Sequence, residues 1–482
     1  MRLHDLSLPL DPASPEPMYR QLAQGITEAI ARKVLKPGAL LPGTRALAEH
    51  LHIARNTVIL AYSELAAEGW VEQRVGSGTM VCLRPPDPAR TPTPDLEGDP
   101  EDATAFDFIT SQLGQATDPA QDAALDMRDG WPDPRLFPVE DLAQAYRRLL
   151  SRRQSEVLGL GDSLGHLRLR QELAAWLGER RGIFVGVEQI LITRGSRHAL
   201  SLLTRALLRP GDAVVVENPG HPDLWEVLRM ARARILPLPV DAEGLQLEAL
   251  EAILAKERPR LLCCSPQSQF PTGAVLSEPR RQRLLELAAE ARMAVAEVDR
   301  DAEWTFGEPL PLPLASQGSA GSVLFLGSFL NLLAPGLRLG FLVAKASIVE
   351  RLARLGQSTE AQGDRALEAA VAALMADGTL ARHVRRARRV YQERRNLVAA
   401  RLAPLEGIHA PAPRSGLGFW AELRDPGDMA RLLAQASAQG LLFHGEAHYD
   451  LHGSAGTHLR LGFGGLNTEE LGRALDGFER LF

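Results

Sequence analysis

Three features are scarce in this sequence: cysteine, aromatic residues and charge of one dominant sign. Aromatic residues make up 5% of the 482 residues, and the three cysteines are Cys82, Cys263 and Cys264. An odd number of cysteines without metal-ligand spacing argues against a disulfide framework and predicts reduced thiols in a cytoplasmic protein, with no metal site. The net charge of −6 leaves no general basic surface, so contact with nucleic acid requires a local patch.

Long apolar runs are missing as well. The amino terminus, MRLHDLSLPLDP, has neither the basic region nor the apolar core of a secretory signal. The best candidate for a membrane span, at 323–344, is broken by glycine, proline and Arg338. The sequence therefore predicts no membrane span and no membrane partner.

The chain changes in character at a segment that is poor in aliphatic residues. Residues 83–106 are rich in proline, aspartate and threonine, which is typical of an extended, solvated linker. This linker separates residues 1–82 from residues 107–482. Because a chain of this length exceeds what one hydrophobic core supports, we expect two or three domains.

Residues 1–82 have the pattern of a small helical domain that ends in a hairpin. Apolar residues four apart predict a first helix, namely Met18, Leu22, Ile26 and Ile30. A second helix is expected after Thr44 as its N-cap, and a third over 55–68 with Gly69 at its end. Two short apolar segments around VGSG then predict a two-stranded hairpin. This order of elements is that of a winged helix-turn-helix.

Several residues of this domain have the chemistry of DNA contact. Helix starts and a close-approaching hairpin can offer side chains and free N–H groups to phosphates and base edges. The candidates are Arg45, Arg55, Asn56, Thr57, Arg74, Gly76, Ser77 and Gly78. Arginine and threonine are also common at the helix ends of any small helical domain, so these residues alone leave both interpretations open. The segments LPGTRALA, RNTV, EGW and GSGT, however, resemble the GntR-type winged helix, and the resemblance extends over 18–81.

The remaining residues alternate amphipathic helical segments with short aliphatic strands. ILITRG, AVVVENPG, RLLCCSPQ, AVAEVDRD and VLFLGS are examples of these strands. Such alternation predicts an α/β fold with a mainly parallel sheet covered by helices. GFWAEL, LLFHGE and HLRLGF, near the end of the chain, predict a smaller C-terminal α+β domain.

The large unit resembles a known enzyme fold. GWPDPRLFP, LGLGDSLG, ITRGSRHAL, ENPGHP, SPQSQFPTG and GSFLNLLAPGLRLGF occur in the order found in fold-type I aminotransferases. Fusion of this fold to a GntR-type winged helix is similar to the MocR subfamily of bacterial regulators. The resemblance implies a DNA-binding homodimer in which the aminotransferase-like domain senses an effector, with pyridoxal phosphate as the usual family cofactor.

At the cofactor positions that the resemblance implies, this chain departs from the family. Asn331 stands where the family has the Schiff-base lysine, and an amide nitrogen cannot attack an aldehyde. Val298 replaces the carboxylate that holds the pyridinium proton, and Arg300 replaces a tyrosine. Leu160 and His221 also stand at positions of family tyrosines. We therefore predict that no catalytic residue is present and that pyridoxal phosphate is not held covalently.

Other parts of the family pattern remain. Gly195, Ser196 and Arg197 open a helix after a strand, a geometry that favours a phosphate. Ser328 and Arg338 stand where the family contacts that phosphate, and Arg460 where it binds a substrate carboxylate. A second interpretation is structural, with glycines required by turns and Ser196 as a helix cap. Three hypotheses remain: a regulator that uses another anionic or carboxylate effector or none, a regulator that binds pyridoxal phosphate noncovalently, and, least favoured, an aminotransferase.

Overall fold

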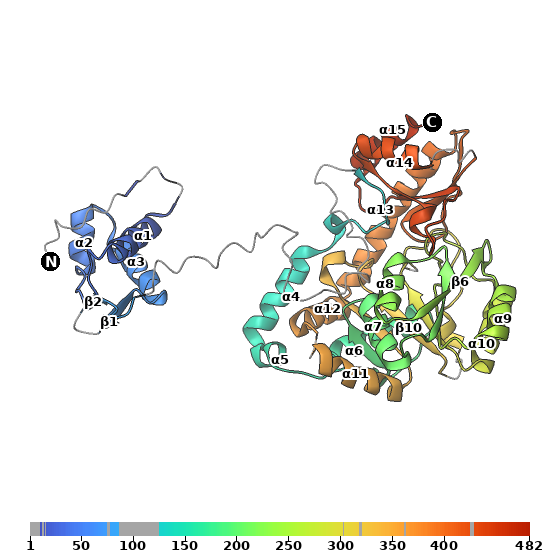
Figure 1. Cartoon of the computed structure of the whole chain (residues 1–482), viewed down its shortest axis with the longest axis horizontal. Coiled ribbons are helices and arrows are strands. Elements are labelled where there is room, and N and C mark those ends of the chain that lie inside the picture. The colour runs from blue at the N-terminus through green and yellow to red at the C-terminus, as the bar shows by residue number, and fades with distance from the viewer. Residues whose placement is uncertain are drawn as a thin grey trace. The chain divides into compact units, whose positions relative to one another are not determined.

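The structure is a computed structural model, and the residues that it describes fall into two compact units. It describes residues 10–11, 14, 16–74, 78–85, 125–301, 303–317, 321–360, 363–424 and 429–482. Contacts divide the chain into Met1–Phe108 and Ile109–Phe482 (Figure 1). The predicted linker, 83–106, lies outside the described residues from position 86 onward. Each unit is therefore described by itself.

The first unit contains the predicted helices and hairpin. Its elements are α1 (Met18–Ala31), α2 (Thr44–Leu51), α3 (Arg55–Ala67), β1 (Val71–Arg74) and β2 (Gly78–Val81), and the two strands are antiparallel. Leu22 and Ile26 of α1 are buried together with Tyr62 and Leu65 of α3. The prediction that Thr44 is an N-cap is wrong. Gly43 precedes α2 in extended conformation without a capping side chain, and Thr44 is the first helical residue.

The second unit is built on a mixed, mainly parallel sheet of eight strands in the order β4-β11-β10-β9-β8-β5-β6-β7. The strands are β4 (Ile190–Thr193), β5 (Ala213–Asn218), β6 (Arg234–Asp241), β7 (Gly244–Leu245), β8 (Leu261–Cys264), β9 (Ala294–Asp299), β10 (Val323–Ser328) and β11 (Gly340–Val343). Strand β11 runs antiparallel to both its neighbours, and β7 runs antiparallel to β6. The predicted α/β fold with a mainly parallel sheet is confirmed.

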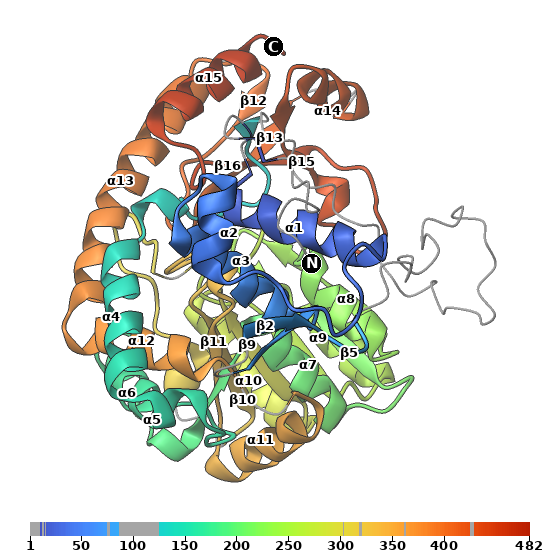
Figure 2. The same ribbon diagram turned by 90° about the vertical axis from the view of Figure 1, so that its left-hand side faces the viewer.

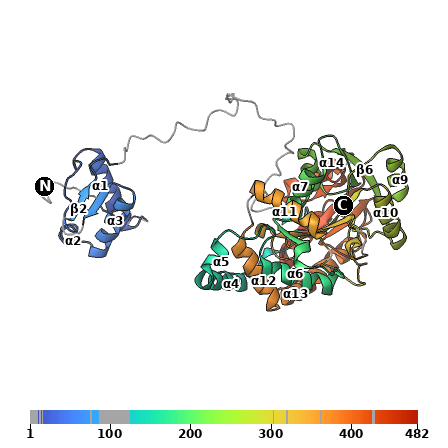
Figure 3. The same ribbon diagram turned by 90° about the horizontal axis from the view of Figure 1, so that it is seen from below.

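Helices cover both faces of this sheet because side chains along each strand alternate between the two faces. One face packs against α7 (Ser196–Leu207), α8 (Pro222–Met230) and α11 (Ala346–Glu360). The other packs against α6 (Leu167–Arg181), α9 (Leu247–Lys256), α10 (Glu278–Glu290) and α12 (Arg365–Ala376). Helices α9 and α10 lie side by side at one edge of the unit (Figure 3). Two further helices, α4 (Val139–Arg152) and α5 (Gln154–Leu158), contact α12.

A smaller α+β part closes the chain, as predicted. Its antiparallel sheet has the order β12-β13-β16-β15, formed by Ile408–His409, Gly418–Leu423, His458–Gly462 and His444–Gly445. Strand β14 (Leu441–Leu442) pairs with β3 (Leu125–Asp126), which precedes the large sheet in sequence. The long helix α13 (Thr379–Leu402) leads into this part and ends beside α15 (Thr468–Glu479), and α14 is Met429–Ala438 (Figure 2).

Two expectations from composition can be compared with this fold. All three cysteines are free thiols, and Cys263 and Cys264 are buried in β8. Within the described parts of the chain, no helix is both long enough and apolar enough to span a membrane.

Candidate functional site

The predicted DNA-contacting side chains of the helices gather at the starts of α2 and α3. Arg45 is the second residue of α2, and Arg55, Asn56 and Thr57 open α3. Arg45, Arg55 and Asn56 are exposed, while Thr57 is partly buried. The Arg55 Nε donates to the Thr44 Oγ1 over 3.4 Å, which brings the two helix starts together. The structure thus places these four residues in one region of the domain.

The predicted wing residues are described only in part. The backbone of Arg74 pairs with Gly78 in the hairpin register. Gly78 is exposed and has a φ of +86°, a conformation that favours glycine. Gly76 and Ser77 lie outside the described residues, as does the side chain of Arg74.

In the second unit, Arg300 lies just beyond the carboxyl end of β9 and is enclosed by aromatic groups. Its guanidinium lies 4.3 Å from the ring centroid of Phe270 and 5.0 Å from that of Trp131. Its Nη2 donates to the Asp129 backbone oxygen at 3.1 Å. Only 10% of the side chain is exposed. Arg300 therefore fills the space over Phe270 with a desolvated cation held by two rings.

His221 completes this cluster. Its Nε2 lies 2.7 Å from the Arg300 Nη1, and its ring lies against Phe270 at a centroid distance of 4.8 Å. Burial, reinforced by the charge of Arg300, holds the pKa of His221 well below its ordinary value. The imidazole is therefore neutral at neutral pH.

Asn331 is buried beneath the cluster and is fixed by polar contacts. Its Nδ2 donates to the Asp301 Oδ1 at 2.6 Å and to the Arg300 backbone oxygen at 3.3 Å. Its own backbone oxygen accepts from the Trp304 Nε1 at 3.0 Å. Asn331 also lines a cavity of about 30 Å³. Val298 is buried in β9 beside Leu326 of β10 and offers no polar atom.

The predicted phosphate-binding residues lie at the start of α7 and the end of β10. Gly195 precedes α7 with a φ of +96°, and a Cβ on it would lie 3.9 Å from the Ser328 Oγ. Ser328 accepts from the Leu330 backbone N–H at 3.1 Å. The alternative that Ser196 caps the helix is wrong, because Gly195 holds the N-cap position and Ser196 is the first helical residue.

The arginines of the predicted pocket have different surroundings. Arg197 is half exposed and pairs with Asp223 at 3.4 Å. Arg338 has a φ of +47°, is exposed and lines a separate groove of about 300 Å³ with Arg194 and His198. Arg460 is buried, lies 4.4 Å over Phe270 and donates to the Pro271 backbone oxygen at 2.6 Å. The structure brings together His221, Arg300 and Arg460, and places Arg197 and Arg338 at exposed positions.

Comparisons with known proteins cover both units. Residues 18–81 match the model of the bacterial regulatory proteins of the gntR family, and residues 130–478 match that of aminotransferase class I and II. MocR of Rhizobium meliloti, assigned to the regulation of rhizopine catabolism, is 30% identical over 98% of this chain and 96% of its own length. The pyridoxine biosynthesis regulator PdxR of Corynebacterium glutamicum is 29% identical over 97% of both chains. This chain belongs to the MocR subfamily of GntR-family transcriptional regulators.

The aminotransferase-like unit of this MocR-subfamily chain also matches solved enzymes. LysN, the α-aminoadipate aminotransferase of Thermus thermophilus, solved with N-(5'-phosphopyridoxyl)-L-leucine, is 30% identical with a TM-score of 0.69. The match covers 75% of this chain and 92% of LysN. The family therefore implies pyridoxal phosphate as its cofactor, and the GntR-type domain implies DNA binding.

The residues present here do not fit a covalently held pyridoxal phosphate. Asn331 offers an amide that is already bound to Asp301, and Val298 offers no carboxylate. The guanidinium of Arg300 packs on Phe270, and its Nη1 lies 2.7 Å from the Nε2 of His221, which also contacts that ring. A planar cofactor would have to displace this guanidinium before it could lie against the same face of Phe270.

Sequence reasoning missed several residues that build this cluster. Phe270 lies under both Arg300 and Arg460, Trp131 contacts Arg300, and Asp301 and Trp304 hold Asn331. The family resemblance indicates positions that contact the cofactor, whereas these residues contact Arg300, Arg460 and Asn331. The arginine at position 300 could have indicated such neighbours, because a buried guanidinium needs aromatic or acidic side chains around it.

Proposed function

We propose that this chain is a transcriptional regulator that binds operator DNA through its winged helix and whose aminotransferase-like unit neither binds pyridoxal phosphate covalently nor catalyses transamination. The observation that supports this proposal is the Arg300 guanidinium, which packs on Phe270 and Trp131 beside the buried Asn331, the residue that the family resemblance aligns with the Schiff-base lysine. An aminotransferase needs an amine there, and an amide is not nucleophilic.

A small anionic or carboxylate effector is the ligand class that the cluster favours. Arg460 is buried, and its Nε has no hydrogen-bond partner among the described residues. The Arg300 Nε likewise has no hydrogen-bond partner there, although it lies 3.9 Å from the Asp301 carboxylate. A buried guanidinium with an unused N–H is suited to a carboxylate, which can accept two hydrogen bonds. Noncovalent binding of pyridoxal phosphate is the second candidate, favoured by the Gly195 and Ser328 pair at the start of α7.

The test is addition of pyridoxal phosphate to the purified full-length chain. We expect no covalent adduct at Asn331 and no specific adduct elsewhere after borohydride reduction and peptide mapping, which is tractable because the chain has four lysines, Lys33, Lys36, Lys256 and Lys345. The control is the triple variant Val298→Asp, Arg300→Tyr, Asn331→Lys, which should gain an adduct at residue 331. A stoichiometric adduct on the unchanged chain, or steady transamination by it, would refute the proposal. A rise in melting temperature without an adduct would favour noncovalent binding.

We also propose that the regulator is a homodimer. The family places position 160 at contact with a partner subunit, and Leu160 is 91% exposed in the single chain. This exposure leaves the Leu160 side chain free to contact a partner subunit. Light scattering of the purified protein should give twice the chain mass of 52.5 kDa, and a monomeric mass at micromolar concentration would contradict this assignment.

A further inference from the structure

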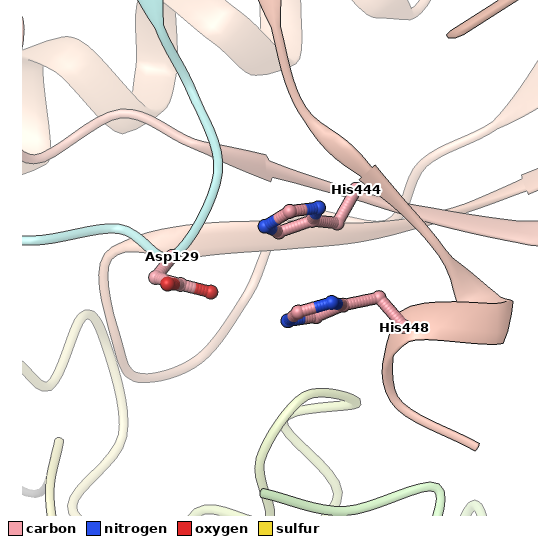
Figure 4. Close-up of side chains that lie close together, drawn as sticks. All are labelled: Asp129, His444 and His448. Atoms are coloured by element: carbon pink, nitrogen blue, oxygen red, sulfur yellow. The ribbon is translucent and has the colours of Figure 1, made fainter. Parts of the chain in front are cut away.

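Three side chains with metal-ligating atoms converge in the second unit (Figure 4). Asp129 follows β3, His444 begins β15, and His448 ends the short 3-10 helix Glu446–His448. One ligand atom from each lies within 4.8 Å of the other two. Asp129 and His444 are partly buried, whereas His448 is exposed, so the group is open to solvent on one side.

The two imidazole rings are aligned with each other. Their centroids lie 3.8 Å apart and their planes differ by 8°, and Asp129 faces the edges of both rings (Figure 4). One ring nitrogen of each histidine faces the Asp129 carboxylate (Figure 4). Imidazole nitrogens and carboxylate oxygens are ligand atoms that metals of the zinc class accept.

One buried residue contacts all three side chains. The Tyr449 hydroxyl donates to the Asp129 Oδ1 at 3.2 Å. The Tyr449 ring stands edge-on to His448 at a centroid distance of 4.9 Å and to His444 at 6.1 Å. Orientation of ligands by a neighbour that does not itself bind the metal is typical of protein metal sites.

We propose that Asp129, His444 and His448 bind one divalent transition-metal cation of the zinc class. Two imidazoles and one carboxylate suit Zn²⁺, Co²⁺ or Ni²⁺, while Mg²⁺ and Ca²⁺ prefer oxygen ligands alone. Ligand atoms at about 2.0–2.2 Å from a zinc ion lie roughly 3–3.5 Å apart, so the three groups must close by up to about 1.5 Å. Three protein ligands leave a fourth position for water or for a ligand atom of an effector.

The proposed metal site is also connected to Arg300 through Asp129. The Asp129 carboxylate faces the histidines, while its backbone oxygen accepts from the Arg300 Nη2 at 3.1 Å. Closure of the three ligands around a cation therefore moves the residue that anchors Arg300. This inference goes beyond the proposed function, which requires no metal. The cysteine pattern gave no sign of the site because none of its ligands is a cysteine.

The experiment is a titration of the metal-free full-length chain with Co²⁺, followed by visible absorbance and by melting temperature. We expect saturable binding of one Co²⁺ per chain with the intense visible bands of low coordination number. His448→Ala and Asp129→Asn should each weaken binding by about tenfold or more. His409→Ala is the matched control, because His409 is an exposed histidine on the same small sheet, and it should leave binding unchanged.

Two results would overturn the proposal. One is the absence of saturable one-to-one binding to the unchanged chain. The other is binding that His448→Ala leaves as tight as before. Because His448 is exposed, this variant should keep the metal-free melting temperature, so that a loss of binding reports on the ligand and not on folding.

Discussion

The Arg300 Nη1 and the His221 Nε2 lie 2.7 Å apart, and this contact determines the tautomer of the imidazole. A guanidinium has only donors, so His221 must accept at Nε2 and carry its proton on Nδ1. Nδ1 is buried and has no hydrogen-bond partner within the described residues. Arg300 thus stabilises the neutral form of His221.

The first prediction concerns the stability that Arg300 contributes. Arg300→Ala removes two cation–π contacts and leaves the His221 Nε2 and the Asp129 oxygen without a donor. We expect the free energy of unfolding to fall by roughly 1–3 kcal/mol, measured by urea unfolding. Arg197→Ala is the control, because its exposed ion pair with Asp223 should contribute about 0–1 kcal/mol. Equal losses in the two variants would contradict the enclosed position of Arg300.

The second prediction concerns the close approach of β11 to the start of α7. A Cβ at Gly340 would lie 2.5 Å from the Gly195 Cα and 2.9 Å from its nitrogen, both backbone atoms that cannot rotate away. Gly340→Ala should therefore cost about 1–3 kcal/mol or more in unfolding free energy. Gly336→Ala should change it by less than about 0.5 kcal/mol, since nothing lies within 4 Å of that Cβ. Melting curves of the two variants test this difference, and similar curves would count against it.

The sequence predicted most elements of the fold because their patterns are local. The short aliphatic runs of β9 and β10 and the four-residue spacing of apolar residues in α1 are each contained in one short segment of the chain. The N-cap of α2 was misassigned by one residue, because Gly43 and Thr44 are both acceptable there and the backbone geometry decides between them.

The surroundings of the site residues could not be predicted in the same way. Arg300 meets Trp131, His221 and Phe270 only after β5, β8 and β9 are assembled, and no pattern in the neighbourhood of position 300 indicates these partners. Arg460 stands where the family resemblance implies a contact with a substrate carboxylate, and its packing on Phe270 and its hydrogen bond to the Pro271 backbone oxygen are contacts between distant parts of the chain. His444 and His448 are close together in sequence, whereas Asp129 lies near the start of the second unit.

The third prediction is a pH dependence that Glu217 produces. Glu217 is buried in β5, where its Oε1 accepts from the Ser265 N–H at 3.1 Å, and burial raises its pKa to about 8. Between about pH 4.5 and pH 8 the folded chain therefore retains a proton that the unfolded chain releases. The contribution of Glu217 to stability is full at the acidic end of this window and falls as the pH rises.

The variant Glu217→Gln isolates this effect. Glutamine does not titrate in this range and can still accept from Ser265. We expect the unfolding free energy of the variant to fall less steeply with pH than that of the unchanged chain, by up to about 1.4 kcal/mol per pH unit. Urea unfolding at pH 5.5, 6.5 and 7.5 measures both slopes. Parallel slopes would show that Glu217 is ionised in the folded protein throughout this range.

The fourth prediction concerns DNA. Arg55 is exposed at the start of α3 and lies beside Thr44 of α2, so its guanidinium can reach a base edge in the major groove. Against a duplex selected from random sequences by the unchanged chain, Arg55→Ala should weaken binding by roughly 1–3 kcal/mol and relax specificity at one position. Arg32→Ala is the control, because Arg32 is also exposed but follows α1, where it lies 3.4 Å from Glu28. If Arg45→Ala, Arg55→Ala and Arg74→Ala combined in one variant left binding and its salt dependence unchanged, the assignment of this surface as the DNA-binding face would be wrong.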